Sequence, residues 1–367
     1  MYRRVAGVGL ALTMLVAGCG HSSSTSQGPA TSSTPVPSVA TSSTRAASAT
    51  SQAARDLPDP HTLRGLTEVP ELPDPKPVEG SSAQKLPVTV TDVEGNKVTI
   101  KSTSRILALD LYGTLSRTLI GLGLGDKIVG RTVSSTEKQL HDRPVVTENG
   151  HVLNVEAVAG LKPSVIIADR SVGPKEALDQ LRKSGIPVVL VDPHRSVGST
   201  PQLIRTIADA VGKPDAGEAL VKRTQEQIDQ AKKQIAAWKP AKSMRVAFLY
   251  VRGNAGVFFI LGSENGASEL IQGVGADDVA SDKGITTLVP ANAESLVSIN
   301  PDAIFVMRDG LASTGGMKGL LARAGVANTT AGRKQRVISI PDGISLSFGP
   351  QTGEVLTAVA KALYGVK

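Results

Sequence analysis

The sequence contains a single cysteine, Cys19, among its 367 residues. The rest of the chain therefore cannot form an intramolecular disulfide. Aromatic residues make up only 3% of the chain, and no run of lysines or arginines is interleaved with rings on which bases could stack. Nucleic acid is thus not a predicted partner, although the formal net charge is +7 and the pI about 9.4. No apolar run after residue 19 has the length of a membrane span.

Signatures of hydrolytic and metal-dependent catalysis are also missing. The chain has no G-x-S-x-G nucleophile elbow and no H-E-x-x-H zinc motif. The spacing that would place two histidines on one helix face does not occur among His21, His61, His141, His151 and His194. We therefore predict that the protein is not an enzyme, with an exported α/β enzyme kept as an alternative.

The N-terminal residues 1–19 carry a targeting pattern. Arg3 and Arg4 precede an apolar core, and small residues lead into Cys19. This arrangement predicts a secretory signal with a lipobox, in which Cys19 carries the lipid. The protein is then expected to be lipid-anchored in the cell membrane, on its extracytoplasmic face.

The next part of the chain, residues 20–85, is rich in Ser, Thr and Pro. Such a composition buries too little apolar surface to fold, so a flexible tether is predicted, extended along the domain surface from residue 56 onward. Folded structure is predicted to begin near Leu86 with a hairpin, because apolar and polar residues alternate on both sides of a Gly-Asn turn.

One pattern occurs twice, as NVEAVAGLKPSVI at residues 154–166 and NAESLVSINPDAI at residues 292–304, an offset of 138 (292 minus 154). Each copy starts with an asparagine that can cap a helix, stops at a proline and continues as an apolar strand. Two similar α/β lobes are therefore predicted, at residues 86–213 and 241–367. Residues 214–240 contain an amphipathic stretch of roughly 35 Å, at about 1.5 Å per residue, long enough for a lobe-spanning helix. A single stiff connector of this kind would allow only small closure between the lobes.

Candidate ligand-binding residues lie at the edges of the two lobes. His151 precedes the first repeat, whereas Tyr250 and Arg252 end an apolar strand of the second lobe. Ligands of open α/β sheets bind outside the carboxyl ends of the strands, so these side chains could face one another across a cleft. Imidazole and phenolate are both axial ligands of haem iron, and a neighbouring guanidinium would hydrogen-bond the phenolate and favour its ionised form. From the residues alone, a solvated histidine and a packed tyrosine remain the stronger interpretations.

Several motifs together resemble one known family. They are RILALD, ENGHVLNVEAVAGLKPSVI, FLYVRG, ESLVSINPDAIFVM, GGMKGLLARAGVANTTAGR and LSFGPQTGEVL. From about Pro87 to the C-terminus the chain resembles the solute-binding proteins of ABC importers with a helical backbone, the class III type. Within them it is similar to actinobacterial haemin-binding lipoproteins. This resemblance implies two Rossmann-like lobes joined by one long helix.

The resemblance also implies roles for particular residues. His151 and Tyr250 would ligate haem iron from the two lobes, and Arg252 would support the tyrosine. Glu156 and Glu294, which from residue type alone could equally complement helix N-termini, would dock onto the permease. Relatives that carry a tyrosine in the loop before the first repeat differ from this chain, whose ENGH loop has none.

The expected function is capture of haemin and its delivery to an ABC permease with its ATPase, by a monomer that binds no nucleic acid. Arg131, Arg170 and Arg308 are candidates to pair with propionates, and Met307 and Met317 are alternative iron ligands. A binder of ferric siderophores or a cobalamin-like ligand with the same fold is the first alternative. The second is an exported enzyme or a haem sensor that is not coupled to transport.

Overall fold

The computed structural model describes residues 57–79, 83–254 and 256–367. The predicted leader, the lipid site at Cys19 and most of the predicted tether lie outside these residues. Within the described ranges, no helix combines the length and the apolar character needed to cross a bilayer.

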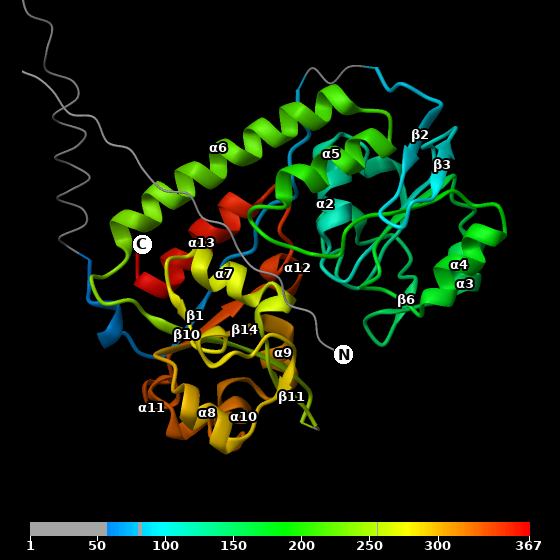
Figure 1. Ribbon diagram of the computed structural model, residues 1–367. Helices are drawn as coiled ribbons and strands as arrows, with labels where there is room; N and C mark the ends of the chain where they lie inside the picture. Colours follow the sequence, from blue (N-terminus) through cyan, green and yellow to red (C-terminus); the bar gives the residue numbers. More distant parts are fainter. Residues whose placement is uncertain (1–56, 80–82, 255) are drawn as a thin grey trace, which may run out of the picture. The chain divides into compact units, whose positions relative to one another are not determined.

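The N-terminal lobe, drawn in cyan and green in Figure 1, is built on a four-stranded parallel sheet with the order β5-β4-β8-β9. Its strands are short and apolar: β4 (Ile106–Leu109), β5 (Ile128–Gly130), β8 (Val165–Ala168) and β9 (Val188–Leu190). Every residue of β4, β8 and β9 is buried, as is typical of parallel strands covered on both faces. The helices of this lobe are α2 (Thr114–Gly121), α3 (Val155–Gly160), α4 (Lys175–Lys183) and α5 (Thr200–Ala210).

Two small antiparallel pairs accompany this sheet. The predicted hairpin is confirmed as β2 (Val88–Thr91) and β3 (Lys97–Ile100), and β6 (Thr147–Glu148) pairs with β7 (Val152–Leu153). Short 3-10 turns connect elements in both lobes: η1 (Pro60–Thr62), η2 (Gly125–Lys127), η3 (Lys138–Leu140), η4 (Ser263–Asn265), η5 (Ser281–Lys283) and η6 (Val326–Asn328).

The C-terminal lobe contains a seven-stranded sheet with the order β1-β15-β14-β10-β11-β13, and β12 pairs with β10. The strands are β1 (Leu66–Glu68), β10 (Arg245–Arg252), β11 (Val257–Ile260), β12 (Asp277–Asp278), β13 (Val289–Pro290), β14 (Ala303–Met307) and β15 (Val337–Ile340). Pairing is parallel except where β11 meets β10 and β13. The helices are α7 (Ala267–Gly273), α8 (Ala293–Ile299), α9 (Arg308–Ser313), α10 (Gly316–Leu321), α11 (Thr330–Lys334), α12 (Asp342–Ser345) and α13 (Thr352–Tyr364).

The repeated pattern forms the same local structure in both lobes. Asn154 caps α3 and Asn292 caps α8, each side chain accepting a hydrogen bond from the third backbone N–H of its helix. The chain leaves each helix through a residue of positive φ directly before the proline, Lys162 at 44° and Asn300 at 37°. It then enters β8 or β14, as the pattern predicts.

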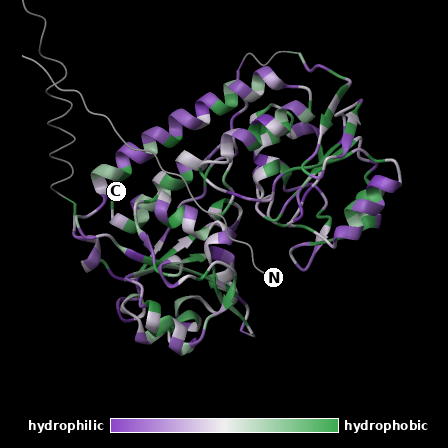
Figure 2. Ribbon diagram, viewed as in Figure 1, coloured by the Kyte–Doolittle hydropathy of each residue, from purple (hydrophilic) through white to green (hydrophobic). Residues whose placement is uncertain are grey.

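The predicted connecting helix is confirmed as α6 (Pro214–Trp238). Leu220 packs into the core of the N-terminal lobe, while Ala231 and Ile235 pack into the core of the C-terminal lobe. The helix therefore contributes to both cores, and hydrophilic residues recur along its length (Figure 2).

A second connection corrects the sequence prediction. Residues 57–79, which we call the strap, are not a flexible tether: they include β1, which pairs in parallel with β15 at the edge of the sheet. Further along the strap, Asp74 accepts hydrogen bonds from the backbone N–H groups of Lys138 and Gln139 in the N-terminal lobe, at 2.8 and 2.9 Å. The strap thus joins the two lobes, and α6 is not the single connector. A three-residue edge strand has too few positions to show a periodicity, so the pattern of the sequence could not reveal it.

Candidate functional site

A cavity of about 470 Å³ is lined by residues of both lobes. This volume lies in the range of sites for small organic ligands and cofactors. The N-terminal lobe contributes residues that follow β4, β5 and β6, and the C-terminal lobe contributes residues at or just after the ends of β10, β14 and β15. The cavity therefore lies outside the carboxyl ends of parallel strands, where the sequence analysis expected a ligand.

The wall of the cavity is largely apolar and carries a few polar groups. Its aliphatic members are Leu111, Val133, Leu261, Leu288 and Leu346. Three of them, Leu111, Val133 and Leu288, keep 38–43% of their surface exposed, so they form an apolar rim that a flat hydrophobic ligand could cover. The polar members include Tyr112, Thr136, Tyr250, Arg252 and Asp342.

Tyr250 and Arg252 lie on the same face of β10, because side chains two residues apart in a strand point the same way. The guanidinium carbon of Arg252 lies 4.8 Å from the centroid of the Tyr250 ring, a cation–π arrangement. The hydrogen bonds of Arg252 go to Val251 O, Met307 Sδ and Asp342 Oδ1, at 3.1, 3.2 and 2.6 Å. The sequence analysis expected a hydrogen bond to the phenol oxygen, and the structure instead places the guanidinium over the ring face.

Asp342 is a site residue that the sequence analysis missed. Its Oδ2 accepts a hydrogen bond from the backbone N–H of Asp309 at 2.8 Å, while its Oδ1 holds Arg252. Burial raises the pKa of Asp342, and both hydrogen bonds oppose that rise. The available signal was its position two residues after the apolar stretch at residues 337–340, at the sheet edge where ligands bind.

His151 lies in the loop between β6 and β7 and is exposed. Asn149 and Gly150 turn the chain with φ of 50° and 88°, and the backbone carbonyl of His151 accepts a hydrogen bond from Gly173 N at 2.9 Å. Gly150 lines the cavity, whereas His151 is not among the lining residues. The loop therefore reaches the cavity through Gly150, the residue that precedes His151 in the chain.

The other candidates are distributed as follows. Met307 lines the cavity, while Met317 packs against the hydrophobic core beside β14. None of the three arginines proposed for propionates lines the cavity: Arg131 donates to Ser135 O, Arg170 pairs with Glu94 and Asp179, and Arg308 pairs with Glu71. Neighbouring acceptors hold these guanidinium groups in the structure, and their pairing with propionates stays a prediction.

A buried acidic cluster lies behind Tyr112 in the N-terminal lobe. Asp110 and Asp169 follow β4 and β8 and are fully buried, and Arg195 donates a short hydrogen bond to Asp169 and lies 3.8 Å from Asp110 Oδ2. The guanidinium of Arg195 also lies 5.5 Å from the centroid of the Tyr112 ring. Burial, together with the charge of Asp169, raises the pKa of Asp110 to about 7. The sequence analysis did not find this cluster, because its members are spread over three separate segments.

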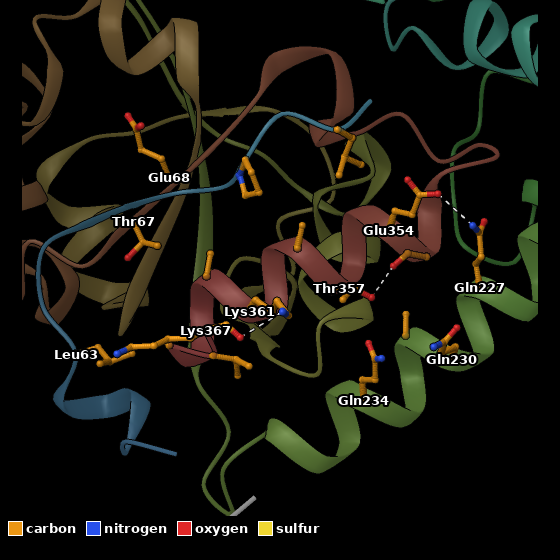
Figure 3. Close-up of a pocket in the computed structure, with 18 of the residues that line it drawn as sticks. Leu63, Thr67, Glu68, Gln227, Gln230, Gln234, Glu354, Thr357, Lys361 and Lys367 are labelled. Atoms are coloured by element: carbon orange, nitrogen blue, oxygen red, sulfur yellow. Dashed lines mark hydrogen bonds between the residues drawn. The ribbon is translucent and has the colours of Figure 1, made fainter. Parts of the chain in front are cut away.

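A larger hollow, of about 810 Å³, lies elsewhere, between the strap, α6 and α13 (Figure 3). The close-up shows side chains of Gln227, Gln230 and Gln234 on α6 opposite Thr357 and Lys361 on α13. Neither histidine nor an aromatic ring lines it. The cavity that contains Tyr250 is smaller but holds the groups suited to an iron ligand, so it is the candidate site.

Comparisons with known proteins agree with this geometry. The family model described as "Periplasmic binding protein" matches residues 111–343, which cover both lobes and every lining residue named above except Leu346. The chain belongs to this periplasmic binding protein family. Among curated relatives of this periplasmic binding protein, an uncharacterised ABC transporter substrate-binding lipoprotein of Bacillus subtilis is 27% identical over 280 residues, covering 76% of this chain and 86% of the relative. A cobalamin-binding protein of Halobacterium salinarum is 25% identical, over 80% of this chain and 78% of its own.

Solved structures of haem-binding proteins share the fold. The haem-binding protein HmuT is 49% identical, with a TM-score of 0.83 over 84% of this chain and all of its own. The periplasmic haem-binding protein RhuT of Roseiflexus is 32% identical, with a TM-score of 0.67 over 72% of this chain and 99% of its own. The class III fold predicted from the sequence is confirmed.

Variants of HmuT have also been solved, in which one histidine, one tyrosine or one arginine is replaced by alanine. In the present chain His151 and Tyr250 are 99 residues apart (250 minus 151), and Arg252 follows Tyr250 by two. The three replaced residues of HmuT have this same spacing.

Proposed function

We propose that this periplasmic binding protein captures ferric haem in the cavity between its lobes and delivers it to the permease of an ABC importer. The observation that carries the proposal is Tyr250, set in a largely apolar cavity of about 470 Å³ with a guanidinium over its ring. A phenolate is a hard anionic ligand suited to iron(III), and Arg252 places a positive charge 4.8 Å from the centre of the Tyr250 ring. The 49% identity to HmuT supports haem as the ligand.

In this proposal Tyr250 and His151 are the two axial ligands. Tyr250 projects from a rigid strand of the C-terminal lobe, whereas His151 comes from a loop of the N-terminal lobe whose neighbouring residue lines the cavity. The shared spacing with the residues replaced in HmuT supports both assignments. Two bonds from separate lobes would hold the haem in transit and would both be lost if the lobes were separated.

The proposal is tested by titrating ferric haem into the purified protein. The expected result is a six-coordinate absorption spectrum with a tyrosinate-to-iron charge-transfer band, which disappears in Y250F and changes to a five-coordinate form in H151A. Unchanged haem affinity and spectrum in the H151A/Y250A double variant would contradict the ligand assignment. T89A, in the β2–β3 hairpin, is a suitable control because Thr89 bonds only to Thr99 across that hairpin.

A cobalamin or a related corrinoid is the second candidate, favoured by the cobalamin-binding relative. Competition between haemin and cyanocobalamin for the protein distinguishes the two. We expect haemin to displace the corrinoid and not the reverse. The phenol oxygen of Tyr250, with the charge of Arg252 beside its ring, suits iron(III) better than it suits the cobalt of cobalamin, which brings its own lower ligand.

The finer assignments belong to the same proposal. Cys19 would carry the lipid that holds the protein on the extracytoplasmic face of the membrane, and residues 1–18, which precede that cysteine, would be removed. The chain would act as a monomer without catalytic activity, and Glu156 and Glu294 would contact the permease. Both glutamates lie in the first turns of their helices, α3 and α8, and both are exposed, which supports a role in docking.

A further inference from the structure

Asp342 lies between the pair formed by Tyr250 and Arg252 and the interface of the two lobes. On one side its Oδ1 accepts a hydrogen bond of 2.6 Å from Arg252, the guanidinium that lies over the Tyr250 ring. Arg252 has little freedom to move elsewhere, because Gly310 of α9 packs against it so closely that an added Cβ would lie 2.1 Å from Arg252 Nη1. The carboxylate of Asp342 therefore fixes the position of the positive charge at the tyrosine.

On its other side, Asp342 is followed by Gly343, which contacts the N-terminal lobe. The carbonyl of Gly343 accepts a hydrogen bond of 3.2 Å from Arg117 Nε of α2. A Cβ on Gly343 would lie 2.0 Å from Thr136 Oγ1, so no side chain fits between the lobes at this point. A movement of the N-terminal lobe would therefore act directly on Gly343, the residue next to Asp342.

Arg117 is itself held firmly. Its side chain is 5% exposed and lies 3.4 Å from the carboxylate of Glu137, which is fully buried. It also donates a hydrogen bond of 2.7 Å to Gln351 Oε1 at the start of α13. One buried guanidinium of α2 therefore contacts the C-terminal lobe both beside Asp342 and beside α13.

We propose that Asp342 is a positioning residue that holds Arg252 over the ring of Tyr250 and, through Gly343 and Arg117, links this arrangement to the position of the N-terminal lobe. The inference rests on the proposed function, because it concerns the strength of the Tyr250–iron bond. While the lobes keep this contact, Asp342 holds the positive charge of Arg252 over the ring of Tyr250. When a permease separates the lobes, Arg117 leaves Gly343, the hold of Asp342 on Arg252 loosens, and the Tyr250–iron bond weakens at the moment of delivery.

The test compares D342N with D282N in the full protein loaded with ferric haem. Both variants remove one negative charge from the C-terminal lobe, but Asp342 bonds the Arg252 side chain, whereas Asp282 is exposed and does not line the cavity. We expect D342N to shift the tyrosinate-to-iron charge-transfer band and to release haem to apomyoglobin about tenfold faster, the order expected for loss of one charged hydrogen-bond partner. D282N should change the release rate less than about twofold. Equal spectra and release rates in the two variants would overturn the inference.

The link to the other lobe is tested with R117Q and the double variant R117Q/D342N. If the contacts form one relay, the double variant releases haem no faster than the faster single variant, whereas independent sites give additive effects on the logarithm of the rate. Additive effects on the logarithm of the rate would contradict the link between Asp342 and the N-terminal lobe. If R117Q does not fold, G343A replaces it in the same comparison, because its Cβ would push against Thr136. Failure of the wild-type protein to give a tyrosinate spectrum would instead count against the proposed function itself.

Discussion

At the scale of single residues, the acidic cluster behind Tyr112 is costly to fold in its ionised form. Asp110 is fully buried, its Oδ1 has no hydrogen-bond partner among the described residues, and Asp169 lies near enough to raise its pKa. Arg195 is the cation beside both carboxylates, yet of these two it donates a hydrogen bond to Asp169 and not to Asp110. Two carboxylates and one guanidinium leave an excess of negative charge that protonation of Asp110 removes.

The first prediction concerns the stability of the protein against pH. Because burial and the charge of Asp169 raise the pKa of Asp110 from its ordinary value of 3.8 to about 7, its contribution to stability is complete below about pH 4 and is lost as the pH rises through about 7. D110N keeps a neutral group at this position and should raise the free energy of unfolding at pH 8 by about 2–4 kcal/mol, with little gain at pH 4. Urea unfolding at the two pH values measures this. A variant less stable than the wild type at pH 8 would show that the ionised carboxylate is favourable.

The sequence could predict only those contacts of the candidate site that join residues close together in the chain. Tyr250 and Arg252 are two residues apart on one strand, so their common face followed from the alternation of a strand. Asp342 is 90 residues from Arg252, and its contact depends on the order of β10, β14 and β15 in the sheet. Arg170 illustrates the same limit: the sequence places it near a strand end, but only the structure shows that Glu94 holds its guanidinium.

At the scale of elements, the strap matters because it crosses between lobes together with α6. Its β1 is part of the C-terminal sheet, and Glu71 pairs with Arg308 at 2.7 Å in that lobe. Asp74 then reaches the N-terminal lobe, where Gln139 Nε2 also donates to it at 3.2 Å. Two connectors that cross at different places restrict rotation of one lobe about the other more than a single helix does.

The second prediction tests this connector. D74A removes the acceptor of two backbone N–H groups at the start of η3, so it should destabilise the protein by about 1 kcal/mol, as loss of a helix cap does. It should also speed proteolytic cleavage within the strap. E71Q is the matched control within the same segment, because an ion pair with a 62% exposed glutamate contributes only about 0.2–1 kcal/mol. Equal cleavage rates in D74A and E71Q would mean that Asp74 does not secure the strap.

Elements with a strong internal signal were predictable from the sequence. The two capped helices, their proline stops and the long amphipathic α6 all carry such signals, and each is found in the structure. The strap carries none: β1 reads Leu-Thr-Glu and gains its structure from pairing with β15. An element that is defined by its partner strand cannot be recognised from its own residues.

At the scale of the whole molecule, each lobe presents an exposed glutamate in the first turn of the helix formed by its copy of the repeat. Glu156 lies in α3 and Glu294 in α8, and each follows the capping asparagine of its repeat by two positions. Their contribution to the stability of the folded protein is small, because a carboxylate at an exposed helix N-terminus is worth only about 0.3–1 kcal/mol. Two equivalent carboxylates on separate lobes are well placed to transmit a pull from a partner to both lobes at once.

The third prediction separates docking from haem binding. E156K and E294K reverse one charge on each lobe, and we expect haem uptake by cells to fall about tenfold for each variant and further for the double variant, because attraction to a basic permease surface becomes repulsion. Haem affinity and the absorption spectrum of the purified variants should match those of the wild type, since neither glutamate lines the cavity.

E176K is the matched control: Glu176 is also an exposed glutamate in the first turn of a helix, α4, in the same lobe as Glu156. If E176K lowers uptake as strongly as E156K, the effect comes from the overall charge of the lobe and not from a docking contact. If none of the three variants lowers uptake, the permease must recognise another surface.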